Sequence, residues 1–401
     1  ARGWKKKMTE DPKKTAKIAV IGAGWWSQGW HLPALHRNER ADVVAIVDTS
    51  PHPQSVLNPD LRPLIALGET YGARTYSSAT ALLEAEGPSL DGVLVATPHA
   101  THHTVYMEIV REIDRRNGEE GATVRPLHVL MEKPMSTDVR HAVELFTMAK
   151  APRPCGSRFW INHSANWRVQ TRLLREAVAS GTIGRVRHVS ASFASPLRWI
   201  FDDPACTGWN APTGNMIRNG FAWGQASHLL AFLYHVCGDL EPAEVSCTMN
   251  FSATTGADVS HAATVRCSDG EGDDVVVSIS GTALLPGNAH SDPPVPKRVR
   301  LETFGERGSL HYGGDDRDPA SGRLEARYED GSVEVLHKEF RFENLDNEDC
   351  GPESLQEFVR LCCGECDVYE GADASDGLRS IQTIDAMYRS HASKKTEQVY
   401  S

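Results

Sequence analysis

Short apolar runs rich in β-branched residues recur at wide intervals through the first third of the chain. They cover residues 17–21, 43–47, 92–96 and 127–131, and glycine or a polar residue follows each run. The interval between the first two runs is long enough to hold one helix. Strands that alternate with helices are typical of βαβ units and a parallel sheet. We therefore expect an α/β fold whose ligand site lies beyond the carboxyl ends of these strands.

The pattern changes after residue 160. We expect helices at residues 170–180, 226–236, 354–362 and 376–389. Strand-like segments include residues 186–194, 264–267, 275–280, 298–304 and 332–336, and they predict a mainly antiparallel sheet between residues 244 and 336. The resulting division is a mobile tail over residues 1–16, one domain over 17–160 and a second over 161–401. The charged stretch 111–126 follows a helix that begins near His102, and we expect it to be a surface insertion.

Composition excludes several classes of protein. A chain of 401 residues, with 40% apolar and 24% charged residues, can bury the cores of two globular domains. Its net charge of -11 argues against a nucleic-acid partner, and it has no apolar run of the ~20 residues that a membrane span needs. Nine irregularly spaced cysteines suit a reducing compartment. We expect a cytoplasmic protein, with an organelle after removal of a leader as the alternative.

A glycine motif follows the first predicted strand. Gly22, Gly24 and Ser27 form a Gly-x-Gly-x-x-Ser version of the dinucleotide-binding fingerprint, and Asp48 follows the second strand. The glycines permit a tight turn and close approach of a pyrophosphate, and a carboxylate at Asp48 would bind ribose hydroxyls. The same carboxylate would repel the 2′-phosphate of NADP, and residues 49–52 include no arginine. NAD is therefore the expected cofactor, with NADP kept possible.

These residues belong to a longer series of motifs that resembles a known family. In order they are Gly22-Ala23-Gly24, His31-Leu32-Pro33-Ala34-Leu35, Val47-Asp48, Ala96-Thr97-Pro98-His99 with His102, and Glu132-Lys133-Pro134. The series resembles the glucose-fructose oxidoreductase, inositol dehydrogenase and rhizopine-catabolism (Gfo/Idh/MocA) family. The resemblance implies an N-terminal Rossmann domain and a C-terminal α/β domain with a large open, mainly antiparallel sheet, which binds substrate and supports oligomers. An uncovered apolar face of that sheet would also favour a homodimer or larger assembly.

The resemblance also assigns residues. It implies Lys133 and His228 as catalytic residues, although the acid that usually precedes the histidine is replaced by Gly224, with Gln225 beside it. His99 stands where the family usually has asparagine. The cofactor-binding candidates are Gly22, Gly24, Trp25, Trp26, Asp48, Thr97, Pro98, His99, His102, Glu132 and Lys133. The substrate-binding candidates are Asn162, His163, Asn166, Trp167, Arg168, Trp209, Arg218, Asn219 and Gln225.

Each candidate has a structural alternative. Trp25 and Trp26 could be core aromatics, His228 a buried hydrogen-bonded histidine, and the two polar substrate stretches exposed loops. Cys363 and Cys366 are spaced as a redox or metal pair, but no second cysteine or histidine pair has zinc-like spacing, so no metal site is expected.

The expected function is hydride transfer between NAD(H) and a sugar, cyclitol or related polyol, with Lys133 exchanging the hydroxyl proton. Two alternatives remain. The protein could bind NAD and a ligand as a sensor or partner without turnover, or it could recycle tightly bound NAD within a lyase, epimerase or glycosidase reaction.

Overall fold

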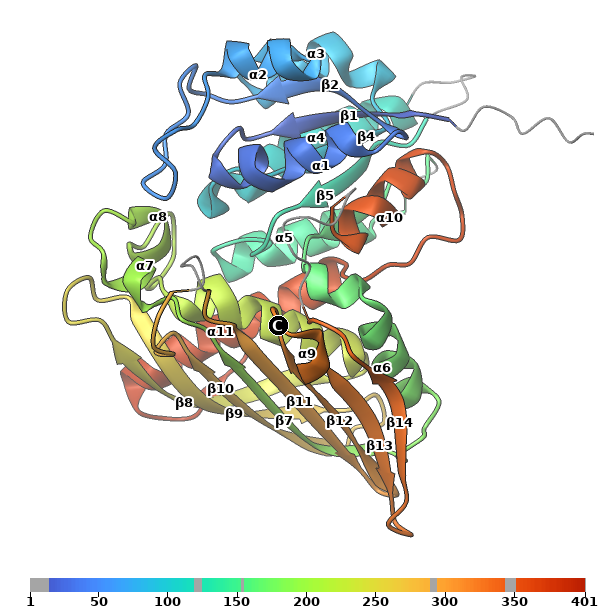
Figure 1. Ribbon diagram of the computed structural model, residues 1–401, viewed down its shortest axis with the longest axis vertical. Helices are drawn as coiled ribbons and strands as arrows, with labels where there is room; N and C mark the ends of the chain where they lie inside the picture. The colour runs from blue at the N-terminus through green and yellow to red at the C-terminus, as the bar shows by residue number, and fades with distance from the viewer. Residues whose placement is uncertain (1–13, 119–124, 153–154, 289–293, 343–350, 401) are drawn as a thin grey trace, which may run out of the picture.

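The computed structural model describes residues 14–118, 125–152, 155–288, 294–342 and 351–400. Most of the expected tail, residues 1–13, and residues 119–124 of the expected insertion lie outside the described residues. Two sheets lie one above the other, and α5 (Val139–Lys150), α9 (Ser227–Val236) and α11 (Ala374–Ser393) pack between them (Figure 1).

The first sheet is parallel, with six strands in the order β3-β2-β1-β4-β5-β6. The strands are β1 (Ala16–Ile21), β2 (Ala41–Val47), β3 (Arg74–Tyr76), β4 (Gly92–Val95), β5 (His128–Met131) and β6 (Phe159–Ile161). The order reverses between β1 and β4, and open α/β sheets bind ligands at such a switch point, beyond the carboxyl ends of the strands. The central strands β4 and β5 are buried on both faces.

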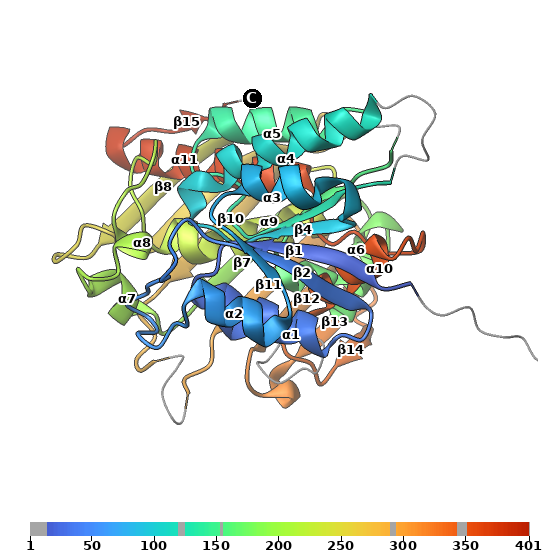
Figure 2. The ribbon, with the colours of Figure 1, turned by 90° about the horizontal axis from the view of Figure 1, so that it is seen from above.

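Helices cover both faces of this sheet (Figure 2). One face packs on α1 (Leu32–Arg37), α2 (Leu64–Tyr71) and α10 (Glu353–Cys362), and the other on α3 (Ala79–Glu86), α4 (His102–Asn117) and α5. The helix α10 therefore crosses from the C-terminal part of the sequence to cover the N-terminal sheet.

The prediction of a surface insertion at residues 111–126 is wrong for residues 111–117, because α4 continues through Asn117. Glu112 and Arg116 are buried and ion-paired one helical turn apart, and the Arg116 guanidinium also donates to the backbone carbonyls of Gly87 and Leu90. Through these bonds the charged residues attach α4 to the turn before β4. Charge in this stretch therefore does not indicate a solvent-exposed loop.

The second sheet has nine strands in the order β14-β13-β12-β11-β7-β10-β9-β8-β15. All neighbouring pairs are antiparallel except β7 with β10. The strands are β7 (Val186–Ala194), β8 (Glu241–Phe251), β9 (Asp258–Ser268), β10 (Asp274–Thr282), β11 (Arg298–Gly305), β12 (Gly308–Asp315), β13 (Arg323–Tyr328), β14 (Val333–Lys338) and β15 (Glu397–Gln398).

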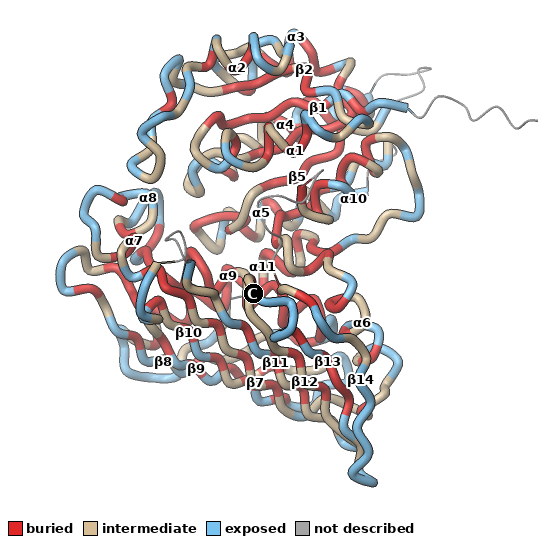
Figure 3. The backbone as a smooth tube through the Cα atoms, in the orientation of Figure 1, coloured by how far each residue is buried: buried red, intermediate tan, exposed pale blue. Residues whose placement is uncertain are grey.

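Among the described residues, helices pack on one face of this sheet, and they are α6 (Val169–Ala179), α9 and α11 (Figure 3). Buried residues alternate with more exposed ones along the central strands, as a sheet with one covered face requires. The open face of these strands carries small side chains, most of them polar, such as Ser190, Ser192, Thr264, Ser278 and Ser280, together with the exposed apolar residues Ala262 and Val276. The expected apolar face is therefore met only in part along these strands.

Candidate active site

The turn after β1 has the shape that a pyrophosphate site requires. Gly22 has φ of +99°, and a Cβ at this position would lie 2.4 Å from the backbone oxygen of Ala96, so only glycine fits. A Cβ on Gly24 would meet nothing within 4 Å, which leaves room for close approach of a ligand. Helical structure begins at Trp25, and the N-terminal N–H groups of a helix attract anions. Ser27 fills the third motif position, and its buried hydroxyl donates to the Gly22 carbonyl.

Asp48 lies at the carboxyl end of β2, against this turn. Its Oδ2 accepts from the backbone N–H of Ala23 at 2.8 Å, and its Oδ1 accepts from the N–H of Ser50 at 2.8 Å. The carboxylate is thus fixed beside the glycine turn, where a ribose would lie if the pyrophosphate bound at Gly24. These features fit a bound dinucleotide.

Glu132, at the end of β5, connects the glycine turn to the centre of the site. Its Oε1 accepts from Trp26 Nε1 at 3.0 Å, from His31 Nε2 at 2.8 Å and from Asn162 Nδ2 at 2.7 Å. Burial alone would raise the pKa of this carboxyl, but the bonds from His31 and Asn162 and the Lys133 charge lower the pKa to about 2. Glu132 therefore carries a permanent negative charge. His31 was part of the sequence motif but had no predicted role.

Lys133 follows Glu132 and is half-buried at the same strand end. Its Nζ donates to the backbone carbonyl of Gly224 at 2.9 Å and lies 5.4 Å from the centroid of the Trp209 ring. Gly224 is in η5 (Ala222–Ala226), a turn of π-helix before α9. A backbone carbonyl thus contacts the ammonium at the position where the sequence lacks the expected carboxylate.

Imidazole rings surround Lys133. Burial is the largest cause of the low pKa of His99 and of His163, each about 3, and the Lys133 charge lowers both further. Burial and then Lys133 also hold the pKa of His228 well below its ordinary value, and its ring meets that of His163 edge to face at 5.6 Å. All three rings are uncharged at neutral pH.

The neighbouring loop explains the position of His102. Its Nδ1 lies 2.9 Å from the Pro134 carbonyl and its Nε2 lies 3.0 Å from the Thr97 carbonyl, and the ring is fully buried. His102 therefore lies between two backbone segments, and a neutral ring donates to one of the two carbonyls. Its role in cofactor binding stays a prediction. Pro98 is exposed, and the Thr97 hydroxyl accepts a bond from Thr101 at 2.9 Å.

The stretch after β6 divides into two parts. Asn162 and His163 face Glu132 and His228 respectively, and Ser354 donates to Asn162 Oδ1 at 2.6 Å. Three other candidates in this stretch serve the interior: Asn166 donates to the Ala231 carbonyl, Trp167 to that of Tyr369, and Arg168 pairs with Glu353. Asn166 and Trp167 are fully buried, whereas Arg168 is partly exposed, and a substrate role for the three stays a prediction.

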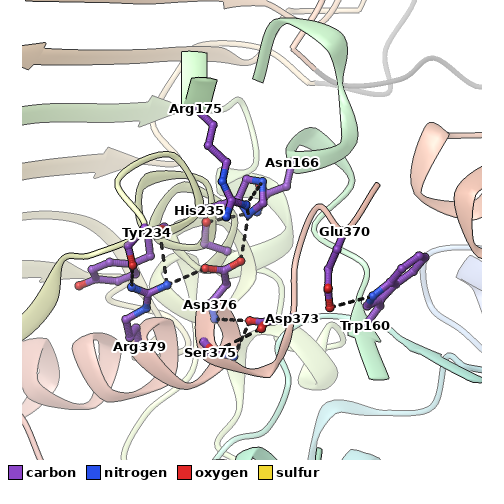
Figure 4. A network of polar contacts seen from close by, with 12 residues as sticks. Trp160, Asn166, Arg175, Tyr234, His235, Glu370, Asp373, Ser375, Asp376 and Arg379 are labelled. Atoms are coloured by element: carbon purple, nitrogen blue, oxygen red, sulfur yellow. Dashed lines mark hydrogen bonds and ion pairs between the residues drawn. The ribbon is translucent and has the colours of Figure 1, made fainter. Parts of the chain in front are cut away.

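Figure 4 shows the network of polar contacts beside Asn166. His235 contacts Asp376 through Nδ1 at 3.2 Å and the Tyr369 hydroxyl through Nε2 at 2.7 Å, and Asp376 pairs with Arg379 at 2.8 Å (Figure 4). These contacts join α9 to α11, so the network fixes the helix that carries His228.

The second predicted substrate stretch is also divided. Trp209 contacts the edge of the His99 ring, with centroids 5.7 Å apart, and so faces the site. Asn219 is buried and donates to backbone carbonyls of the Trp209 loop. Arg218 lies over the Phe251 ring at the end of the second sheet, and its role in the pocket stays a prediction. Gln225 is 8% exposed and its Oε1 has no hydrogen-bond partner.

Trp25 and Trp26 belong to an aromatic cluster that the sequence analysis had only partly foreseen. Trp26 stacks on Trp30 with ring centroids 4.1 Å apart, and Trp25 meets Trp30 edge to face at 5.1 Å. The i, i+4 spacing of Trp26 and Trp30 on a helical segment is a signal for this contact. Trp26 remains 40% exposed, so the cluster is not a closed core.

Comparison with known proteins identifies the family. Residues 16–155 match the Gfo/Idh/MocA oxidoreductase family with an NAD-binding Rossmann fold, and residues 171–311 match the Gfo/Idh/MocA C-terminal domain. The chain belongs to the Gfo/Idh/MocA family. This membership confirms the expected family and fold class, the oxidoreductase class and the NAD-type cofactor.

Individual relatives are distant. An uncharacterized oxidoreductase from Synechocystis is 24% identical over 77% of this chain and 74% of its own length. The solved oxidoreductase from Sinorhizobium meliloti has a TM-score of 0.69 and 17% identity, over 96% of this chain and 99% of its own. The WlbA dehydrogenase from Bordetella pertussis, solved with NADH and UDP-GlcNAcA, has a TM-score of 0.65 and 22% identity, over 97% of this chain and 100% of its own. At these identities the solved structures establish the fold alone.

Among the described residues, no helix is long and apolar enough to cross a membrane. No group of three or more histidine, cysteine, aspartate or glutamate side chains in the same part of the chain is arranged to hold a metal ion.

Proposed function

We propose that this oxidoreductase transfers hydride between NAD(H) and a carbon that carries a hydroxyl or carbonyl group in a sugar, cyclitol or related polyol. The observation that carries the proposal is the position of Lys133 Nζ, at the carboxyl end of β5 and within a group of uncharged imidazoles. Polar rings and the Trp209 face around one amine suit a neutral hydroxylated ligand.

The surroundings favour Lys133 as the group that exchanges the proton. Neither His99 nor His163 can hold a proton at neutral pH, since the pKa of each is about 3. Glu132, with a pKa of about 2, already accepts bonds from Trp26 and His31. In the oxidative direction the Lys133 amine therefore accepts the hydroxyl proton, and in the reductive direction it returns this proton to the oxygen.

The other residues orient the reactants. The cofactor supplies the redox chemistry when it is bound. Gly22, Gly24 and Asp48 would hold it, and Glu132 fixes the backbone of Lys133 by accepting from its N–H at 3.2 Å. His228, as a neutral ring, would donate a hydrogen bond to the substrate oxygen or accept one from it, which makes it the second catalytic residue of the proposal.

The test is a panel of sugars, cyclitols and open-chain polyols incubated with the protein and NAD, followed by NADH absorbance. The proposal predicts NADH formation with at least one member. Ligand binding without any NADH would contradict it and favour a sensor. Substrate conversion with bound NAD that is never released or consumed would instead favour a lyase, epimerase or glycosidase.

A further inference from the structure

The Trp209 indole occupies an unusual place beside the catalytic amine. It belongs to the short helix α8 (Thr207–Asn210), is only partly buried, and has Lys133 Nζ 5.4 Å from its centroid. His99 meets the same ring edge to face at an interplanar angle of 89°. One aromatic side chain thus contacts two of the groups around the proposed reacting centre.

Buried amides hold the Trp209 backbone from both sides. Asn219 Nδ2 donates to the Gly208 carbonyl at 3.2 Å and to the Ala211 carbonyl at 3.0 Å, and this side chain is only 3% exposed. Asn210, 4% exposed, donates to the carbonyl of Asp203. Such bonds fix the loop before any ligand arrives, which lowers the entropy lost on binding.

The ring also depends on the absence of a side chain at position 224. A Cβ on Gly224 would lie 3.4 Å from both Cε3 and Cζ3 of Trp209. A methyl group at this distance makes an ordinary van der Waals contact, whereas any longer side chain that continues toward the indole would overlap it. Gly224 and Trp209 therefore form a matched pair, in which glycine leaves the space that the indole fills.

We infer that Trp209 is the platform on which the substrate ring stacks, and that the substrate is consequently cyclic, with one face of apolar C–H groups. This inference rests on the proposed function for the reaction that follows binding. The negative face of an aromatic ring attracts the polarised C–H groups of a saturated, hydroxylated ring. A ring on the indole carries its hydroxyls toward Lys133 Nζ, because Nζ lies above the same indole. Open-chain polyols present no such face and gain less from Trp209.

The experiment compares binding and turnover with the NAD-loaded protein. Cyclic ligands, represented by myo-inositol and aldopyranoses, and open-chain ligands, represented by sorbitol and mannitol, are titrated by calorimetry, and NADH formation is followed separately. Wild type should prefer a cyclic ligand. Trp209→Leu and Gly224→Asn should each weaken its binding by roughly 10-fold, as expected for loss of an aromatic contact, with little effect on open-chain ligands. Trp209→Phe should lose less.

Gly224→Ala is the matched variant, because its methyl group touches the indole without displacing it. It should lose much less cyclic-ligand binding than Gly224→Asn. Retained NAD affinity and far-ultraviolet circular dichroism show that each variant is folded. Unchanged cyclic-ligand binding in Trp209→Leu, a preference for open-chain ligands, or no binding of either class to wild type would overturn the inference. Trp209-dependent binding of a cyclic ligand without NADH formation would support the inference while contradicting the proposed function.

Discussion

Gly224 shows at the scale of one residue how a missing side chain changes the chemistry of its neighbours. The sequence motif leads one to expect a carboxylate near His228, and its absence suggests an incomplete site. In the structure the Gly224 carbonyl accepts a hydrogen bond from Lys133 Nζ, and the Trp209 indole fills the space beside Gly224. A carbonyl dipole binds the amine without carrying a formal charge. The positive charge of a protonated Lys133 is thus less compensated than it would be beside a carboxylate.

Asp48 provides a prediction about cofactor choice. Its carboxylate is fixed at the glycine turn by two backbone bonds, so a 2′-phosphate would meet a negative charge that cannot move away easily. The nearby cation Arg74 is paired with Glu86. Wild type should bind NAD more tightly than NADP. In titrations monitored by fluorescence, Asp48→Ser should reduce this difference in affinity between the two cofactors. If wild type binds NADP at least as well, the assignment of Asp48 to the ribose is wrong.

At the scale of elements, two π-helical turns shape the site. One is η1 (Ser27–His31), which carries Trp30 and His31 toward Trp26 and Glu132, and the other is η5, which carries Gly224. Single turns of this kind are frequently found at functional sites. The sequence predicted a helix after the glycine motif but not its π geometry, because one additional residue in a turn barely changes the hydrophobic period. The second predicted helix began only at residue 226, where η5 ends.

Asp258, at the start of β9, contacts η5 and should make the stability of the protein depend on pH. It is buried, accepts from the Ala222 N–H at 2.9 Å and from the Tyr388 hydroxyl, and burial raises its pKa to about 6. A carboxyl whose pKa is higher in the folded than in the unfolded protein adds to the free energy of unfolding below about pH 4. This contribution to stability is lost as the pH rises through 6. Two pKa units correspond to about 3 kcal/mol.

Denaturant unfolding of wild type and Asp258→Asn should therefore diverge with pH. The amide cannot ionise, so the free energy of unfolding of the variant relative to wild type should rise between pH 4 and pH 7. A constant difference across this range would show that the Asp258 carboxyl titrates normally.

The regular elements were largely predictable, and the failures have physical causes. Strands with strict alternation, such as residues 186–194, were placed correctly because one face is buried. Short strands such as β3 and β6, with three residues each, were missed because such brief segments carry no period. The helix α4 was ended too early because Glu112 and Arg116 look solvated in the sequence but pair with each other in the interior.

At the scale of the whole molecule, the candidate site was predictable where a motif fixed both the residue and the strand end that carries it. Lys133, Glu132 and Asp48 all lie at carboxyl ends of parallel strands, as the fold requires. Polar residues outside such motifs, such as Asn166 and Arg168, could not be assigned, because their side-chain directions depend on contacts with α9 and α10, which lie far along the sequence. Ser354 was unforeseen because α10 reaches the site from a distant part of the sequence.

The open face of the second sheet leads to a prediction about assembly. In the described part of the chain helices cover one face, and small side chains such as Ser278 and Ser280 on the other would let a second sheet approach closely. We expect a homodimer or larger assembly by light scattering at micromolar concentration. Ser278→Arg, in the central strand β10, should shift the protein toward monomer, and a monomeric wild type would remove the prediction.

Because several histidines are buried, we expect acid to lower the stability of the folded protein. His261 is 5% exposed, neither of its ring nitrogens has a hydrogen-bond partner, and burial lowers its pKa to about 4. A histidine whose pKa is lowered on folding stabilises the protein above its ordinary pKa of 6.5, and this contribution is lost as pH falls toward 4. His128 and His163 act in the same direction. Wild type should therefore lose stability from pH 7 to pH 4.

His261→Leu should reduce this loss by about 3 kcal/mol at most, because roughly two pKa units of differential protonation disappear. Chemical unfolding at pH 7 and pH 4.5 measures the effect. An identical loss in variant and wild type would mean that His261 becomes protonated in the folded protein as readily as in the unfolded chain.

The most direct measurement of the central claim is the turnover of Lys133→Met on a substrate that wild type oxidises with NAD. Methionine keeps much of the lysine stem but removes the amine, so kcat should fall by ~100 to 10,000-fold, the usual contribution of a general acid-base group, while NAD affinity is retained. His228→Ala should cost less, because its ring orients the oxygen without holding the proton. Near-normal turnover of Lys133→Met would contradict the account, since the proton would then leave through another group.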